Sequence, residues 1–227
     1  MALPAWNILR GKTAAITGGT TGVESVEKQG ANAGEVFEIT GDVTDPQTPT
    51  VLIDEAAKRW GSWMLLSRMR VCSRIEPDFL NHSLNMNVTG TFYSCQSAAR
   101  QMVKQRHGGS VIAISSVSAL VGGGLQTRYT PAKAAGLSLM QSMAIALGKH
   151  KIRCKALLPG TINTQLADHD MKNPAKKAYL ETRIPLGRVG EPEDMAGPAV
   201  FLASEEMSRF VNGSGLLADG GMFCNLQ

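Results

Sequence analysis

The sequence has few aromatic residues and few cysteines, and both shortages narrow what the protein can be. Aromatic residues make up 5% of its 227 residues while hydrophobic residues reach 43%, so the apolar content is mainly aliphatic and sufficient for one folded core. The 4 cysteines show no C-x-x-C or other paired spacing, and the 4 histidines form no ligand pattern with them. We therefore expect reduced thiols and no metal site.

Long hydrophobic runs and blocks of like charge are also missing. No apolar run approaches the roughly 20 residues that a membrane-spanning helix needs, and residues 1–10 are too short and too polar for a signal peptide. The net charge is +4, but the 23 basic residues are scattered among acidic ones and form no stripe that would attract nucleic acid or anionic lipid. These absences predict a cytoplasmic protein whose partners include neither nucleic acid nor membrane.

Strand-like and helix-like segments alternate along the chain. Short apolar or β-branched runs predict strands at residues 12–17, 35–40, 109–115 and 152–158. Helical patterns cover residues 85–103, 130–147 and 191–203. Because such an alternation forms parallel sheets, we expect a single α/β domain over residues 1–227. Its fold should be a Rossmann-like, doubly wound parallel sheet with the functional site at the carboxyl ends of the strands.

A tyrosine and a lysine four residues apart form the first part of a candidate site. Tyr129 and Lys133 stand at the start of the expected helix 130–147, where this spacing puts both side chains on one face. An ammonium group beside a phenol favours the phenolate, so we expect Lys133 to lower the pKa of Tyr129 from its ordinary value of about 10. Tyr129 would then exchange a proton with an alcohol or carbonyl oxygen near working pH.

Ser116 supplies the second part of this site. It directly follows the strand-like run 109–115 and precedes Tyr129 across the glycine-rich segment 122–124. A hydroxyl at the carboxyl end of a strand can hydrogen-bond the same substrate oxygen that Tyr129 protonates. A strand that ends in serine, followed by Y-x-x-x-K, resembles the catalytic group of the short-chain dehydrogenase/reductase family. The resemblance implies an NAD(P)-dependent oxidoreductase in which Lys133 also binds the nicotinamide ribose.

Other segments extend the resemblance over most of the chain. In the family, a glycine-rich loop binds the cofactor phosphates, a G-D-V segment contacts adenine, a helix asparagine organises the proton-relay water, and a P-G-x-I-x-T turn holds the carboxamide and phosphates. The resemblance thus implies NAD or NADP as the cofactor, with Asn87, Tyr129 and Lys133 serving both catalysis and cofactor binding. The other matching residues are Gly18, Thr20, Thr21 and Gly22 in the loop, Asp42 and Val43 at adenine, and Pro159, Gly160, Ile162 and Thr164 in the turn.

The amino-terminal half departs from the family in two ways. Glu24 stands where the phosphate loop should have its third glycine, and its carboxylate would face the pyrophosphate at a helix amino terminus. We expect weaker cofactor binding, because like charges 4 Å apart cost about 4 kcal/mol at an effective dielectric constant of 20. The span from Gly18 to Asp42 is also only 24 residues, so part of the amino-terminal βα half is missing or disrupted. The absent strand would end in the residue that separates NAD from NADP, which leaves this preference open.

A third departure is local. At this point of the family pattern a strand ends in Asn-Ala-Gly, whereas residues 62–72 carry two arginines where the strand end should be buried, which is physically unfavourable. A shifted reading frame of the codons for Trp63-Met64 and for residues 68–72 restores an aspartate and an Asn-Ala-Gly-Val run. We hypothesise that residues 62–79 are translated out of frame or follow a misplaced splice site, so that residues 23–79 are truncated or aberrant. As written, the sheet would lack an ordinary central strand.

The expected function is hydride transfer between a nicotinamide cofactor and a carbinol carbon. Tyr129 would be the general acid/base and Ser116 would position the substrate oxygen. Lys133 would tune Tyr129, and Asn87 would organise the relay. Both ends of the chain look most like fungal L-rhamnose 1-dehydrogenases, which implies an aldose such as L-rhamnose as the small-molecule substrate.

Two alternatives to this function remain open. A ketoacyl reductase would use the same catalytic residues. A catalytically impaired pseudoenzyme would instead act as an oligomerising subunit, pairing through the helices that follow residues 85 and 130. Family members form dimers and tetramers through these helices, which implies a homo-oligomer in either case.

Overall fold

The computed structural model describes most of the carboxyl-terminal part of the chain and short pieces of the amino-terminal part. The described residues are 13–17, 41–42, 44–61, 63–67, 77–165 and 167–225. The expected strand 35–40 lies outside them, and so do the residues expected in the phosphate loop and Val43. Gly18, Thr20, Thr21, Gly22 and Glu24 therefore keep their roles as predictions.

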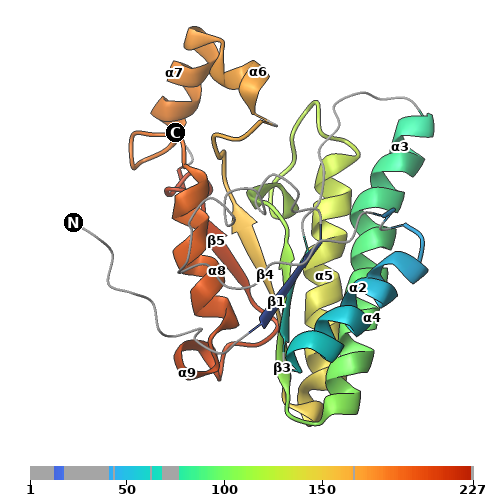
Figure 1. Ribbon diagram of the computed structural model, residues 1–227. Helices are drawn as coiled ribbons and strands as arrows, with labels where there is room; N and C mark the ends of the chain where they lie inside the picture. The colour runs from blue at the N-terminus through green and yellow to red at the C-terminus, as the bar shows by residue number, and fades with distance from the viewer. Residues whose placement is uncertain are drawn as a thin grey trace.

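Among the described residues, five parallel strands form one sheet (Figure 1). In sheet order they are β1 (Thr13–Thr17), β2 (Trp63–Ser67), β3 (Gly109–Ile114), β4 (Ile152–Pro159) and β5 (Gly215–Ala218). The strand order follows the chain order. The reversal of direction that marks a doubly wound sheet therefore does not lie among these five described strands.

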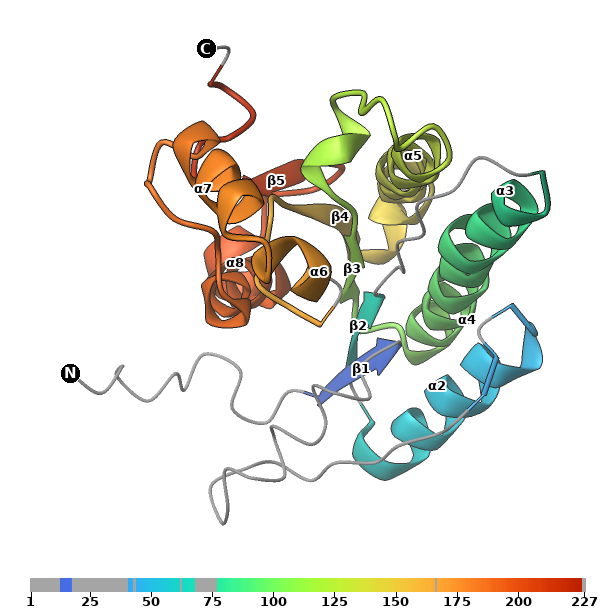
Figure 2. The ribbon, with the colours of Figure 1, turned by 90° about the horizontal axis from the view of Figure 1, so that it is seen from above.

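Helices cover both faces of the sheet (Figure 2). One face carries α2 (Gln47–Trp60), α3 (Pro77–Leu84), a π-helical turn (Asn85–Thr89), α4 (Gly90–Gln105) and α5 (Tyr129–Leu147). The other face carries α8 (Ala196–Ala203), followed by α9 (Glu205–Ser208). Two short helices, α6 (Asp168–Met171) and α7 (Pro174–Arg183), lie beyond the carboxyl ends of the strands (Figure 1). The expected class, an α/β fold with a parallel sheet between helical layers, is confirmed.

The expectation that the sheet lacks an ordinary central strand is wrong. β2 pairs in parallel with β1, where Thr13 stands opposite Trp63, and with β3, where Leu65 stands opposite Val111. The apolar run in β2 suits a strand with neighbours on both sides. The strand ends at Ser67, so both arginines of this segment come after it in the chain.

Alternate residues of β4 build the cores on the two faces of the sheet. Cys154, Ala156 and Leu158 are buried against the face that α4 and α5 cover, together with Met140 of α5. Leu157 points to the opposite face and belongs to a second cluster with residues of α8. Arg153 and Lys155 interrupt the apolar residues of β4, yet all residues from Ile152 to Leu158 are buried, as in a strand that is covered on both faces.

Neither a membrane span nor a metal cluster is found in the part of the chain that the structure describes. None of its helices is both long and apolar enough to cross a bilayer. Within the same residues, no three His, Cys, Asp or Glu side chains gather where they could hold a metal ion.

Candidate active site

The expected serine stands at the carboxyl end of β3. Ser116 is 7% exposed and has extended backbone angles, φ −166° and ψ 159°, where the chain leaves the strand for the 3-10 turn Val117–Ala119. Its Oγ accepts a hydrogen bond from the Ser118 amide at 3.1 Å. The neighbouring Ser115 donates its hydroxyl to the carbonyl oxygen of Lys133 at 2.8 Å, which ties this end of the strand to α5.

Tyr129 and Lys133 stand on the first turn of α5 and share one face, as their spacing predicts. Lys133 is 2% exposed, and its Nζ donates to the carbonyl oxygen of Ile114 at 3.1 Å. The same Nζ lies 5.4 Å from the centroid of the Tyr129 ring. The Tyr129 hydroxyl and the Ser116 side chain are joined by a hydrogen bond. The structure therefore brings Ser116, Tyr129 and Lys133 together at the carboxyl edge of the sheet.

Burial has the largest effect on the pKa of Tyr129. It raises this pKa above the ordinary value, because the charged phenolate would lose its hydration, and the hydrogen bond with Ser116 lowers it in part. The expectation that Lys133 lowers the pKa of Tyr129 is therefore wrong for this arrangement. The physical reason is desolvation, which disfavours the charged phenolate at this buried position.

Asn87 stands in the π-helical turn before α4 and keeps one acceptor unused. Its side chain is 2% exposed, and its Nδ2 donates to the carbonyl oxygen of Ser83 at 2.9 Å. Its Oδ1 is buried without a hydrogen-bond partner among the described residues. π-helical turns are frequent at functional sites, and this one packs against α5, which carries Lys133. A buried acceptor of this kind indicates that a ligand or water supplies the donor.

The turn after β4 begins at Pro159 and passes very close to the end of β5. A Cβ atom at Gly160 would lie 2.7 Å from the Cβ and 2.8 Å from the Cα of Asp219, so only glycine allows this approach. Two residues further on, Ile162 forms a parallel β-bridge with Gly190. The turn is therefore held between β5 and the segment that precedes α8.

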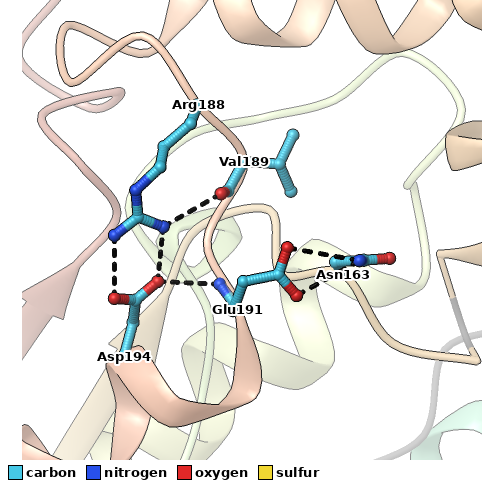
Figure 3. Close-up of polar contacts among 5 residues, drawn as sticks. All are labelled: Asn163, Arg188, Val189, Glu191 and Asp194. Carbon is cyan, nitrogen blue, oxygen red and sulfur yellow. Dashed lines mark hydrogen bonds and ion pairs between the residues drawn. The ribbon is translucent and has the colours of Figure 1, made fainter.

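A polar network extends this contact along the turn (Figure 3). Arg188 binds both carboxylate oxygens of Asp194, at 2.6 and 2.9 Å. The Nδ2 of Asn163 lies 3.3 and 3.1 Å from the two carboxylate oxygens of Glu191. The hydrogen bonds from Arg188 hold the pKa of Asp194 well below its ordinary value, so the pair stays charged in acid. Thr164, the last expected residue of the turn, follows Asn163 and is partly buried.

The expected adenine segment is described only at Asp42. This residue is exposed, and its Oδ1 accepts hydrogen bonds from the amide and the hydroxyl of Thr44, both at 2.8 Å. These bonds lower the pKa of Asp42 and form the turn that leads into α2. The structure gives Asp42 a role in this turn, and its contact with adenine stays a prediction.

The sequence analysis missed two polar residues between Ser116 and Tyr129. The hydroxyl of Ser118 donates to Oε1 of Gln126 at 3.1 Å, and the carbonyl oxygen of Gln126 accepts from the Tyr129 amide at 2.9 Å. Ser118 also bonds Ser116, so the pair connects both halves of the catalytic group. Their positions, two residues after Ser116 and three before Tyr129, were the available signal.

Cavity size alone does not locate this site. Of the two best-formed cavities in the described part of the chain, the larger, about 350 Å³, lies between α2 and α4 and is lined by none of the expected site residues. The smaller, about 160 Å³, is lined by Ile162, Gly190, Arg188 and Asp194 among others. The candidate site is therefore identified by the chemistry of its side chains and not by the volume of a cavity.

The described residues fit the nicotinamide half of a dinucleotide cofactor. Asn87 offers its unused buried acceptor, and Lys133 stands buried beside Tyr129. Gly160 keeps the turn after β4 close to the sheet, where the family pattern requires it. The residues expected at the pyrophosphate lie outside the described part of the chain.

Comparison with known proteins agrees with this geometry. A family described as "Enoyl-(Acyl carrier protein) reductase" matches residues 11–223. The L-rhamnose-1-dehydrogenase of Scheffersomyces stipitis is 46% identical over 256 aligned positions, which cover 97% of this chain and 99% of that protein. An L-rhamnose 1-dehydrogenase (NAD(P)(+)) of Sphingomonas sp. is 47% identical over 211 positions, with 90% of this chain and 82% of that protein covered.

A solved structure and the length of the first alignment give two further findings. A short-chain type dehydrogenase/reductase from Mycobacterium ulcerans superposes with a TM-score of 0.84 at 28% identity, over 94% of this chain and 81% of that chain. The alignment with the Scheffersomyces stipitis protein has 256 positions against 227 residues here, so at least 29 residues of that protein have no counterpart in this chain. The family match, the identities and the catalytic geometry agree: the chain belongs to the short-chain dehydrogenase/reductase family of NAD(P)-dependent oxidoreductases.

Proposed function

We propose that this protein oxidises the C1 hydroxyl group of an aldose, L-rhamnose or a close relative, to the corresponding lactone. The observation that carries the proposal is the assembled group of Ser116, Tyr129 and Lys133 at the carboxyl edge of the sheet. The choice of an aldose is supported by two relatives that are called L-rhamnose dehydrogenases and are 46% and 47% identical to this chain.

Tyr129 transfers the proton at the sugar oxygen. In its phenolate form, the Tyr129 oxygen accepts the proton from the C1 hydroxyl as the C–H bond at C1 breaks. The Ser116 hydroxyl, already hydrogen-bonded to Tyr129, donates to the same sugar oxygen and holds it against the phenolate. When bound, an oxidised nicotinamide supplies the acceptor for the hydride that leaves C1.

Three further elements would hold the cofactor and the sugar. Lys133 would bind the nicotinamide ribose from its buried place beside Tyr129. The turn at residues 160–164 would hold the carboxamide, and Asn87 would bind a relay water through its unused Oδ1. Ser118 and Gln126 are hydrogen-bonded to each other next to the catalytic group, so they are suited to bind further hydroxyl groups of a sugar.

An activity assay with two substrate classes tests the proposal. L-rhamnose with NAD and with NADP should give turnover, and Tyr129→Phe should lower it to the background while cofactor binding is retained, because the variant lacks only the hydroxyl. A ketoacyl substrate serves as the comparison. Turnover of the ketoacyl substrate but not of L-rhamnose would support the ketoacyl reductase alternative, and equal activity of wild type and Tyr129→Phe would remove Tyr129 from the mechanism.

A specific observation favours a second candidate, a catalytically impaired subunit. At least 29 residues of a relative have no counterpart here, and Glu24 replaces a glycine of the phosphate loop. Such a chain would keep a structural role as one subunit of a homo-oligomer. Titration with NADH or NADPH, followed by quenching of tryptophan fluorescence, separates the two candidates: saturable binding at micromolar concentration supports the enzyme, and the absence of saturation supports the subunit.

The proposal extends to the gene, the assembly and the location of the protein. Residues 23–79 would be truncated or aberrant, and sequencing of the transcript tests this directly, since a continuous message that encodes them in frame contradicts it. A homotetramer or dimer in the cytoplasm would suit a dehydrogenase of a small sugar. Light scattering of the purified protein gives the oligomeric state.

A further inference from the structure

The turn after β4 is held in place by a segment that lies almost thirty residues further along the chain. The amide of Asn163 donates to the carbonyl oxygen of Gly190 at 2.8 Å, and the amide of Gly190 donates to the carbonyl oxygen of Thr161 at 3.0 Å. These two bonds form a single bridge centred on Ile162 and Gly190. This bridge joins the middle of the turn to the segment before α8, and the packing of Gly160 against Asp219 holds the start of the turn.

Side chains reinforce this bridge through a connected series of hydrogen bonds (Figure 3). Arg188 holds Asp194 through two hydrogen bonds, and Asp194 accepts the backbone amide of Glu191 at 2.7 Å. The carboxylate of Glu191 then faces the amide group of Asn163, at 3.1 and 3.3 Å. Arg188 also donates to the carbonyl oxygen of Val189 at 3.2 Å, which keeps the intervening backbone compact. The network thus ends on the side chain at the tip of the turn.

A contribution to the stability of the whole fold does not explain this network. Asn163 and Glu191 are both exposed, and exposed polar pairs contribute little to the stability of a fold. Their effect is instead local, because Asn163 stands between Ile162 and Thr164, two of the residues of the turn that the family pattern assigns to the cofactor. A small displacement of a group that holds a reacting molecule has a large effect on its binding or reaction.

We propose that Glu191 is a positioning residue that acts through Asn163 to hold the turn at residues 160–164 in the geometry that binds the nicotinamide carboxamide. The part of this proposal that concerns cofactor binding rests on the proposed function. The part that concerns the geometry of the turn does not. Arg188 and Asp194 serve this role indirectly, because they fix the backbone of Glu191.

Four variants of the full-length protein test the proposal. Glu191→Ala removes the acceptor, and Asn163→Asp places two carboxylates in contact. The double variant Asn163→Asp with Glu191→Gln exchanges donor and acceptor and should restore the contact. Glu193→Ala is the matched control, because Glu193 is an exposed carboxylate in the same 3-10 turn, Pro192–Met195, and forms no hydrogen bond or ion pair with the described residues 160–164.

Two measurements are made on each variant: hydrogen exchange of the Asn163 and Gly190 amides, and the kinetics of L-rhamnose oxidation. We expect faster exchange and about a fivefold higher KM for the cofactor in Glu191→Ala and Asn163→Asp, with kcat within twofold of wild type. The double variant should return both values toward wild type, and the control should change neither.

The outcomes separate this inference from the proposed function. Unchanged exchange in Glu191→Ala and Asn163→Asp would overturn the inference, and so would faster exchange with an unchanged cofactor KM. If the wild-type protein oxidises no sugar with either cofactor, the proposed function fails, and the exchange rates by themselves still support or overturn the hold of Glu191 on the turn.

Discussion

Replacing Lys155 with methionine should stabilise this protein in neutral and acidic solution. Lys155 lies on the face of β4 that α8 covers and is 0% exposed. Its Nζ donates to Oγ of Ser110 at 3.0 Å and to the carbonyl oxygen of Leu202 at 2.5 Å. No carboxylate among the described residues forms an ion pair with it, and the cationic side chain of Arg153 enters the same buried region. Burial, and then the charge of Arg153, lower the pKa of Lys155 from 10.5 to about 7.

The size and sign of the effect follow from this pKa. In the unfolded chain Lys155 keeps its ordinary pKa, so between pH 7 and 10.5 the unfolded state binds more protons and the free energy of unfolding rises with pH. Below pH 7 both states are protonated, and the full cost of the buried charge is present. At 1.36 kcal/mol per pKa unit, this cost is on the order of 5 kcal/mol.

Methionine is suited to the site because it is unbranched, flexible and of similar length. It leaves the carbonyl oxygen of Leu202 satisfied, since Ser110, Arg153 and Ser208 also donate to this atom, at 3.2, 3.2 and 3.1 Å. The variant loses the two hydrogen bonds of Lys155, each of which is worth about 1 kcal/mol net. The expected gain at pH 6 is therefore about 3 kcal/mol.

Urea unfolding at pH 6, 8 and 10 measures this gain. Lys155→Met should be more stable than wild type at pH 6. Its advantage should shrink as pH rises, vanish at about pH 9, and become a disadvantage at pH 10, where the two lost hydrogen bonds outweigh the remaining cost of the charge. Lys104→Met is the matched control, because Lys104 is exposed on α4 and this substitution removes a hydrated charge instead of a buried one. Equal stability of Lys155→Met and wild type at pH 6, or a difference independent of pH, would refute the reasoning.

Three further predictions concern the site. Because burial raises the pKa of Tyr129 and the reaction needs its phenolate, kcat/KM for sugar oxidation should rise from pH 7 to 10, and a flat pH–rate profile would contradict this. Ser116→Ala removes the hydrogen bond that partly lowers this pKa, so kcat at pH 8 should fall about a hundredfold with little change in cofactor affinity measured by fluorescence titration. Gly160→Ala places a Cβ 2.8 Å from the Cα of Asp219 and should lower the free energy of unfolding by about 1–3 kcal/mol, measured by urea denaturation; an unchanged midpoint would show that the backbone yields.

The amino-acid sequence by itself predicted the candidate catalytic group and determined the type of fold. Short apolar runs predicted β3 and β4. The uninterrupted apolar residues of β3 suit a strand covered on both faces, whereas Arg153 and Lys155 interrupt those of β4. The spacing of Tyr129 and Lys133 put them on one helical face, and the place of Ser116 after a strand put it at the same edge. These relations are local, within a turn or at the end of one element, and local patterns are what a sequence displays.

The tertiary structure decided what depends on residues far apart in the chain. β2 forms because β1 and β3 supply hydrogen bonds on both sides, although its sequence looked unsuited to a central strand. Lys155 is buried because α8 covers it, and the pKa of Tyr129 rises because burial outweighs the hydrogen bond with Ser116, whereas the spacing of Tyr129 and Lys133 alone had suggested a lowered pKa. Glu191 meets Asn163 only once β4 and the segment before α8 are packed together. Packing determines which side chains are buried, and burial determines the free-energy cost of a charged group. The sequence therefore predicted the residues of the candidate site, whereas their pKa values depend on the tertiary structure.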